Sequence, residues 1–205
     1  MSERIEWVTH ELRKSADNAK TTFGSLSADQ LNWKPAPKSW SIAQCFDHLI
    51  TTHSLYFPLF EKLAKGDAKQ TFWESYSPLS GFFGRFLIKS LRPENVKPVK
   101  TTAKAFPSSS EIGGDIIDRY VENQEQLSEA IRKIPTDVDP QKTFVTSPLM
   151  GLVTYSLDDC YEIIAIHGPR HFNQAKRVME NEAFPKTNAE PPVIAGGQDG
   201  KNQGG

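Results

Sequence analysis

Apolar residues recur along most of this chain at the three- and four-residue spacing of amphipathic helices. Serines at the N-cap positions Ser41, Ser108 and Ser156 are typical helix starts, and patterns for strands are almost absent. The sequence therefore predicts an all-α fold, a four-helix bundle with a long crossover between helices 2 and 3. The four helical segments are residues 3–23, 41–65, 108–134 and 156–181.

Prolines and turn residues interrupt this pattern. Ser27 and Gln30 form a small capping box that opens a short turn after the first helix. Pro58 lies inside the second helical segment, where it is expected to kink the helix. The pattern loosens over residues 66–107, and so long an excursion in a small domain is usually a functional cover or a crossover.

The crossover contains a helical pattern of its own. Three interpretations are open: a lid, a helix that lies on a membrane surface, or a short helix packed across the bundle. The spacing favours the packed helix. Its apolar positions, expected to share one inward face, are Phe82, Phe83, Phe86, Leu87 and Leu91.

Composition limits the remaining possibilities. Residues 1–184 are expected to form one domain, whereas residues 185–205 are rich in Pro, Gly, Asn and Gln and are expected to be a disordered tail. The net charge of -1 gives no field that would attract nucleic acid. No apolar run is long enough to span a bilayer, and the charged start lacks a signal-peptide pattern. We therefore expect no membrane insertion. The two cysteines make no disulfide framework, so we expect a cytoplasmic protein.

The last helical segment carries the strongest chemical signal. His167 and His171 lie one turn apart on one face, and such a pair can chelate one metal ion. The alternative is a pair of core or interface histidines that bind nothing. A third ligand would favour the metal site over the inert pair. His48 in the second helix is placed to face the bundle interior and could be this ligand. If the second and fourth helices run parallel, the three imidazoles lie at similar depth.

Three neutral imidazoles leave a position open for water or substrate, and they suit zinc, nickel, iron or copper better than magnesium or calcium. Cys45 could add a thiolate, although a small buried apolar role fits it better. Gln174 is a second-shell candidate that could orient a ligand or a water, unless it is only a polar residue at the bundle mouth. Pro169 removes a helical hydrogen bond and would bend the helix, which would splay the histidine pair.

Other polar residues receive weaker assignments. His10 is expected in solvent, and His53 lies off the regular pattern and is given no role. Asp47 and Glu162 are close to the histidines in sequence but are expected at the surface. No catalytic general base is therefore assigned.

Three short motifs occur in order along the chain. They are Trp33-Lys-Pro-Ala-Pro37, Trp40-Ser41-Ile42 followed by His48-Leu49, and His167-x-x-Arg170-His171-x-x-Gln174. In these motifs the sequence resembles the DinB-like (DinB/YfiT) superfamily of metalloenzymes, over about residues 1–182. The resemblance implies a four-helix bundle, often a homodimer, with one divalent metal held by His48, His167 and His171. Zinc or nickel is the favoured ion, with iron as a further candidate.

Two classes of function follow. The first is an enzyme whose metal activates a bound water or thiol, which then attacks an electrophilic small-molecule substrate. The resemblance implies a hydrolase or a thiol S-transferase, with a low-molecular-weight thiol as a second cofactor in the transferase case. The alternative is a non-catalytic bundle that uses its Phe82–Leu91 helix to dock a lipid, a partner or a second copy, with a structural or absent metal. An open all-histidine site argues against a structural metal, because structural sites are usually closed by four protein ligands.

Overall fold

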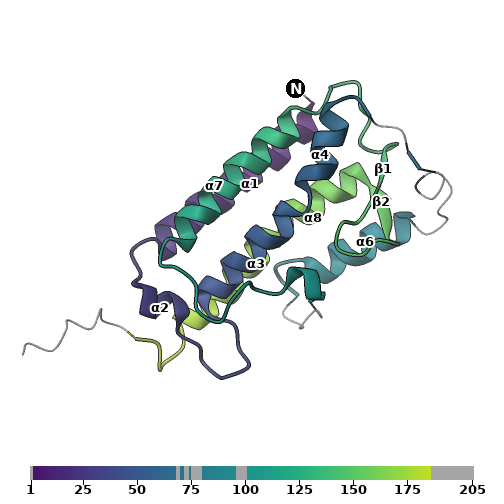
Figure 1. The fold of residues 1–205 in the computed structure, drawn as a ribbon. Coiled ribbons are helices and arrows are strands. Elements are labelled where there is room, and N and C mark those ends of the chain that lie inside the picture. The colour runs from purple at the N-terminus through teal and green to yellow at the C-terminus, as the bar shows by residue number, and fades with distance from the viewer. Residues whose placement is uncertain (1, 68–69, 72–73, 75–79, 96–100, 186–205) are drawn as a thin grey trace, which may run out of the picture.

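A computed structural model of the protein describes residues 2–67, 70–71, 74, 80–95 and 101–185. This part of the chain is predominantly helical, as predicted, with one small antiparallel pair of strands that the sequence pattern does not indicate (Figure 1). Its elements are α1 (Glu3–Phe23), α2 (Ala28–Asn32), α3 (Ile42–Ser54), α4 (Phe57–Ala64), α6 (Ser80–Leu91), η1 (Ala103–Ala105), α7 (Ile116–Arg132), β1 (Phe144–Thr146), β2 (Thr154–Ser156) and α8 (Leu157–Met179).

Four long helices pack in pairs. Helix α1 lies along α7 and α8, and α3 also lies along both α7 and α8 (Figure 1). Helix α6 packs against α8 and against β2, which pairs with β1. The segment between α4 and α7 therefore contributes a short packed helix, which agrees with the favoured interpretation of its pattern.

The interior has three levels along these helices. A first apolar cluster surrounds Val8, Phe60 and Tyr161, and a second surrounds Phe23 and Leu49. Between the two clusters every long helix carries buried polar side chains, which we call the polar layer. Its members are Ser15 on α1, His48, Thr52 and His53 on α3, Asn123 and Gln124 on α7, and His167 and His171 on α8.

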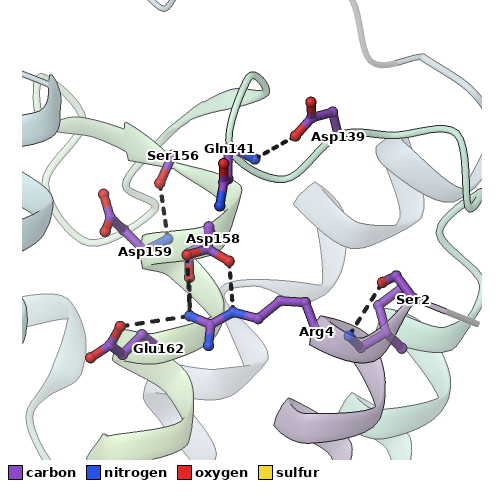
Figure 2. Close-up of polar contacts among 9 residues, drawn as sticks. Ser2, Arg4, Asp139, Gln141, Ser156, Asp158, Asp159 and Glu162 are labelled. Carbon is purple, nitrogen blue, oxygen red and sulfur yellow. Dashed lines mark hydrogen bonds and ion pairs between the residues drawn. The ribbon is translucent and has the colours of Figure 1, made fainter.

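Helix α8 is fixed at its first turn. The Ser156 hydroxyl accepts a hydrogen bond from the Asp159 N–H at 3.0 Å, which confirms the predicted cap. Arg4 of α1 forms an ion pair of 2.6 Å with Asp158 and approaches Glu162 at 3.6 Å (Figure 2). Glu162 is half-buried, and it faces Arg4.

Two predicted helix boundaries are wrong. The segment over 41–65 is two helices, and α4 begins at Phe57 with Pro58 in its first turn, where a proline removes an N–H that has no helical partner. The capping box predicted at Ser108 does not form, and α7 begins only at Ile116. The Ser108 N–H and hydroxyl instead donate to Asp47, and Gly113 and Gly114 disfavour a helix.

The predicted inward face of α6 is wrong in part: Leu87 and Leu91 pack against the first apolar cluster, but Phe82 and Phe86 do not. The side chains of Phe82 and Phe86 are 64% and 57% exposed, and they stack on each other with ring centroids 6.2 Å apart. Gly84 faces α8, so closely that a Cβ there would meet the Asp159 carboxylate. This approach fixes the rotation of α6 and turns Ile88 inward.

The tail predicted over 185–205 lies, apart from Pro185, outside the described residues. Within the described part of the chain, no helix is long and apolar enough to cross a membrane.

Candidate metal centre

Helices α3 and α8 bring the three predicted histidines together. They run antiparallel, not parallel, because Trp40 before α3 stacks on His171 while His53 near the end of α3 packs against His167. His48 still meets both α8 histidines, since each lies near the middle of its helix. The assumption that these two helices run parallel is therefore wrong, although the grouping of the three histidines does not depend on it.

The ring nitrogens converge on one point. The Nε2 of His167 lies 3.3 Å from the Nε2 of His48 and 3.1 Å from the Nε2 of His171. Two imidazole nitrogens bound tetrahedrally to one zinc ion, each about 2.0–2.1 Å from it, lie about 3.3 Å apart. The spacing fits a single ion. The expected splaying by Pro169 does not occur, because α8 continues through this residue.

Outer hydrogen bonds set the tautomers of two of the rings. The Nδ1 of His48 contacts the carbonyl oxygen of Ala105, and the Nδ1 of His171 lies 3.0 Å from Oε1 of Gln174. These oxygens can only accept, so each Nδ1 carries the hydrogen and each Nε2 keeps its lone pair. Gln174 thus contacts a candidate metal ligand, and its role in orienting that ligand stays a prediction.

Burial keeps the three imidazoles neutral. His48, His167 and His171 are 5%, 7% and 7% exposed. Burial lowers the pKa of each ring from its ordinary value, and the neighbouring histidines lower the pKa of His167 and His171 further. Neutral imidazole is the form that binds metals.

The donor set fits a divalent transition metal. The Nε2 lone pairs of His48 and His171 both face the Nε2 of His167, so they are satisfied only by a hydrogen on that nitrogen or by a bound cation. An imidazole set selects zinc, nickel, iron or copper, and three protein ligands leave a further coordination position. Among the described residues, these three histidines form a group that could hold a metal ion.

Comparison with known proteins identifies the family. The family model of the DinB superfamily matches residues 11–175. The chain belongs to this superfamily. The matched range contains all three histidines, and the resemblance found in the sequence motifs is confirmed. No curated protein and no solved structure gives a significant match to the chain.

In this DinB superfamily member the histidines face a large cavity of about 690 Å³. Apolar side chains of α6, of α8 and of Tyr56, which precedes α4, form much of its wall. Lys38, Arg170 and Arg177 contribute positive charge. Among the described residues that line it there is no aspartate or glutamate. Its apolar lining residues include Tyr56, Leu87, Leu91, Leu149, Met150, Ile163 and Ile164.

The crossover forms one side of this cavity. Leu87 and Leu91 of α6 line it, together with Thr102, Ala105 and Phe106 of the segment around η1. The carbonyl that orients His48 comes from the same segment. Described residues of α6 and of the segment around η1 therefore lie beside the histidines, and a functional cover stays a prediction.

Two residues of the site were assigned wrongly from the sequence. Asp47, expected at the surface, is 3% exposed and accepts from the Ser108 N–H at 2.6 Å and from its hydroxyl at 3.1 Å. His53, which was given no role, is fully buried and its Nδ1 lies 3.0 Å from the amide nitrogen of Gln124. Burial lowers the pKa of His53 to about 3. A helical projection hints at neither partner, because both come from other segments.

Cys45 does not join the centre. It is fully buried in the second apolar cluster, where burial raises the pKa of its thiol to about 12. The protonated thiol is a poor metal ligand. Its position agrees with the apolar role that the sequence favours.

Proposed function

We propose that this DinB superfamily member is a metal-dependent enzyme that acts on a small molecule. The Nε2 atoms of His48, His167 and His171 would hold one divalent transition metal. The observation that carries the proposal is the convergence of three buried, neutral imidazoles at the edge of a cavity of about 690 Å³. Three protein ligands with an open side are typical of catalytic sites rather than structural ones.

The chain's own residues would prepare this site. Ala105 and Gln174 hold the rings of His48 and His171 in the tautomer that directs Nε2 inward. Trp40 stacks on His171 with ring centroids 5.8 Å apart and an angle of 23° between the ring planes, which shields that imidazole from water. When bound, a divalent ion would supply a Lewis acid that lowers the pKa of a water or a thiol.

The finer parts of the proposal follow the family. We propose either water or a low-molecular-weight thiol as the nucleophile, hence a hydrolase or a thiol S-transferase, with zinc or nickel as the first candidate ion and iron as the next. We further propose that α1, α3, α7 and α8 are the helices of a four-helix bundle domain over 1–184, with the crossover between α3 and α7. A cytoplasmic homodimer completes the proposal, and the two free, buried cysteines are consistent with a reducing compartment.

A second candidate function, a non-catalytic docking module, is favoured by one observation. Phe82 and Phe86 on α6 expose two stacked aromatic rings, and Arg85 and Lys89 beside them are also exposed. Such a face suits a partner or a lipid surface. It gives no reason for three histidines to converge beside a cavity, so we rank this function second.

Metal analysis tests the proposal. The protein as purified, and after dialysis against zinc, nickel or iron(II), is expected to hold about one ion per chain, as three-histidine sites do. The variants His48→Ala, His167→Ala and His171→Ala should lose it, because two imidazoles remain. His10→Ala is the matched control, since His10 is exposed on α1. Equal metal content in all five proteins would contradict the assignment.

Cobalt substitution separates an open catalytic site from a closed structural one. Azide or imidazole should shift the visible spectrum of the cobalt-loaded protein, because the cavity gives small molecules access to the open position. A spectrum that no added ligand changes would favour the docking module. Product analysis with a panel of electrophilic esters, with and without a small thiol, then distinguishes hydrolase from transferase.

A further inference from the structure

Three polar atoms in the wall of the cavity have no hydrogen-bond partner within the described part of the chain. They are the hydroxyl oxygens of Thr52 and Thr102 and the Nε2 of His53. Thr52 is 3% exposed and His53 is not exposed at all. Buried polar groups are nearly always hydrogen-bonded, because an unmet group loses its bonds to water without replacement. A bound water or ligand would supply the missing partners.

All three atoms can donate a hydrogen bond. The hydroxyl groups of Thr52 and Thr102 rotate freely to present O–H. The amide nitrogen of Gln124 donates to the Nδ1 of His53, so the hydrogen of this neutral ring is on Nε2. A molecule that meets all three groups must offer acceptor atoms.

The donors lie next to the histidine centre. Thr52 follows His48 by one turn on α3, and the His53 ring is 5.8 Å from the ring of His167. Tyr56, about one turn further along the chain, and Leu87 of α6 also line the cavity. A ligand held by these donors would thus have its polar end near the centre and its body among apolar side chains.

The charge of the lining favours an anion over a neutral acceptor. Lys38 and Arg177 both line the cavity, and none of its described lining residues is acidic. Across the whole chain the 25 acidic residues slightly outnumber the 24 lysines and arginines, so a lining with cations alone is not a consequence of composition. A positive field in a partly enclosed site attracts anions.

We infer that this cavity binds a small organic acid, whose carboxylate accepts hydrogen bonds from Thr52 and His53, with Thr102 as a further donor, and whose hydrocarbon body packs against Tyr56 and Leu87. The inference rests on the proposed function, because it names the class of substrate that the histidine centre would act on. It adds the residues that would select this substrate.

Binding of matched compounds tests the inference. The probes are 4-phenylbutyrate and its neutral analogue 4-phenylbutan-1-ol, measured by calorimetry on zinc-loaded and on chelator-treated protein. We expect the acid to bind at least about tenfold more tightly than the alcohol in both forms, because hydrogen bonds to a charged group are the stronger ones.

Isosteric variants locate the donors. Thr52→Val and Thr102→Val should each weaken binding of the acid about five- to tenfold and leave binding of the alcohol nearly unchanged. Thr9→Val is the matched control, a buried threonine on α1 whose hydroxyl donates to the Ile5 carbonyl at 2.9 Å, outside the cavity. If Thr52→Val does not fold, Thr102→Val decides the question.

Three outcomes would overturn the inference. Equal affinity for acid and alcohol would mean that the three polar atoms serve bound water only. Unchanged acid binding in both valine variants would exclude the donors. Acid binding that requires zinc and ignores the variants would make the carboxylate a metal ligand alone, while leaving the proposed function intact. The metal analysis of the histidine variants tests that function separately, so the two failures are distinguishable.

Discussion

The apolar clusters and the polar layer between them are built on the same four helices by different means. In the clusters, side chains such as Val8 and Phe60 fill space and need no particular partner. In the polar layer, each group depends on a definite neighbour, as when the Ser15 hydroxyl and the Tyr120 hydroxyl meet at 2.8 Å. Burial of the apolar clusters therefore stabilises the fold. Burial of the polar layer costs free energy, because its groups lose their hydrogen bonds to water, and the clusters offset that cost.

The comparison explains why the candidate site lies where it does. Buried histidines lose hydration, and a metal ion would offset that loss at His48, His167 and His171. Thr52 and His53 keep unpaired polar atoms beside them. A layer designed only for stability would carry leucine or isoleucine at such positions, so the polar layer indicates function.

The largest expected effect comes from the first apolar cluster. Phe60 is fully buried, and Phe60→Ala should lower the free energy of unfolding by about 3–5 kcal/mol in urea denaturation. Phe60 does not line the cavity, so metal affinity should not change. Phe82→Ala is the matched control, because this ring is 64% exposed and its loss should cost less than about 0.5 kcal/mol. Similar losses in both variants would contradict the division into clusters.

Metal binding at the polar layer should stabilise the folded protein. With free zinc at 100 times its dissociation constant, the free energy of unfolding should rise by about 2.7 kcal/mol relative to chelator-treated protein. The same zinc should leave His171→Ala unchanged, because one ligand is missing. A stabilisation that persists in this variant would place the ion elsewhere.

A variant of Asp47 tests whether the segment around Ala105 and Ser108 supports the polar layer. Asp47→Ala removes the acceptor for Ser108 and should cost about 1–3 kcal/mol in stability. It should also weaken zinc binding about 10- to 100-fold, because Ala105, which orients His48, belongs to the same segment. Asp118→Ala, at an exposed ion pair with Lys20, should change neither quantity. Unchanged zinc affinity in Asp47→Ala would show that this support is dispensable.

The two kinds of region also differ in how far the sequence predicts them. Helical periodicity gives the bounds of α1, and periodicity with the Ser156 cap gives those of α8 to within two residues, because caps and buried faces are local properties. The three histidines were predictable since two share a helix face and one occupies an inward position. Asp47 and His53 were missed because their partners lie about 60 to 70 residues away.

The rotation of α6 shows the same limit. Its sequence favours burial of Phe82 and Phe86, the largest apolar side chains in the helix. The close approach of Gly84 to Asp159 on α8 decides otherwise. A periodic pattern tells that a helix has an apolar face, but contacts with another segment choose which residues are turned inward.

The smallest expected effect is a pH dependence of stability caused by Cys45. This residue lies in the second apolar cluster, one turn before His48 of the polar layer. Burial raises the pKa of the Cys45 thiol from its ordinary value of 9.0 to about 12. Between these values the unfolded chain releases the proton and the folded protein keeps it, so stability falls as the pH rises. At pH 10 the loss specific to this thiol should be about 1.4 kcal/mol.

Denaturation of the wild type and of Cys45→Ala at pH 8 and pH 10 measures this loss as the change in their difference, which cancels the titration of Cys160 and the buried tyrosines. Both proteins should bind about one zinc ion, because Cys45 supplies no ligand to a three-histidine site. Iodoacetamide at pH 8 should alkylate Cys45 in urea and not in the native protein, since the buried thiol is protonated there. Fast alkylation of the native protein, or loss of zinc from Cys45→Ala, would instead make this cysteine part of the polar layer and would extend the candidate site toward the start of α3.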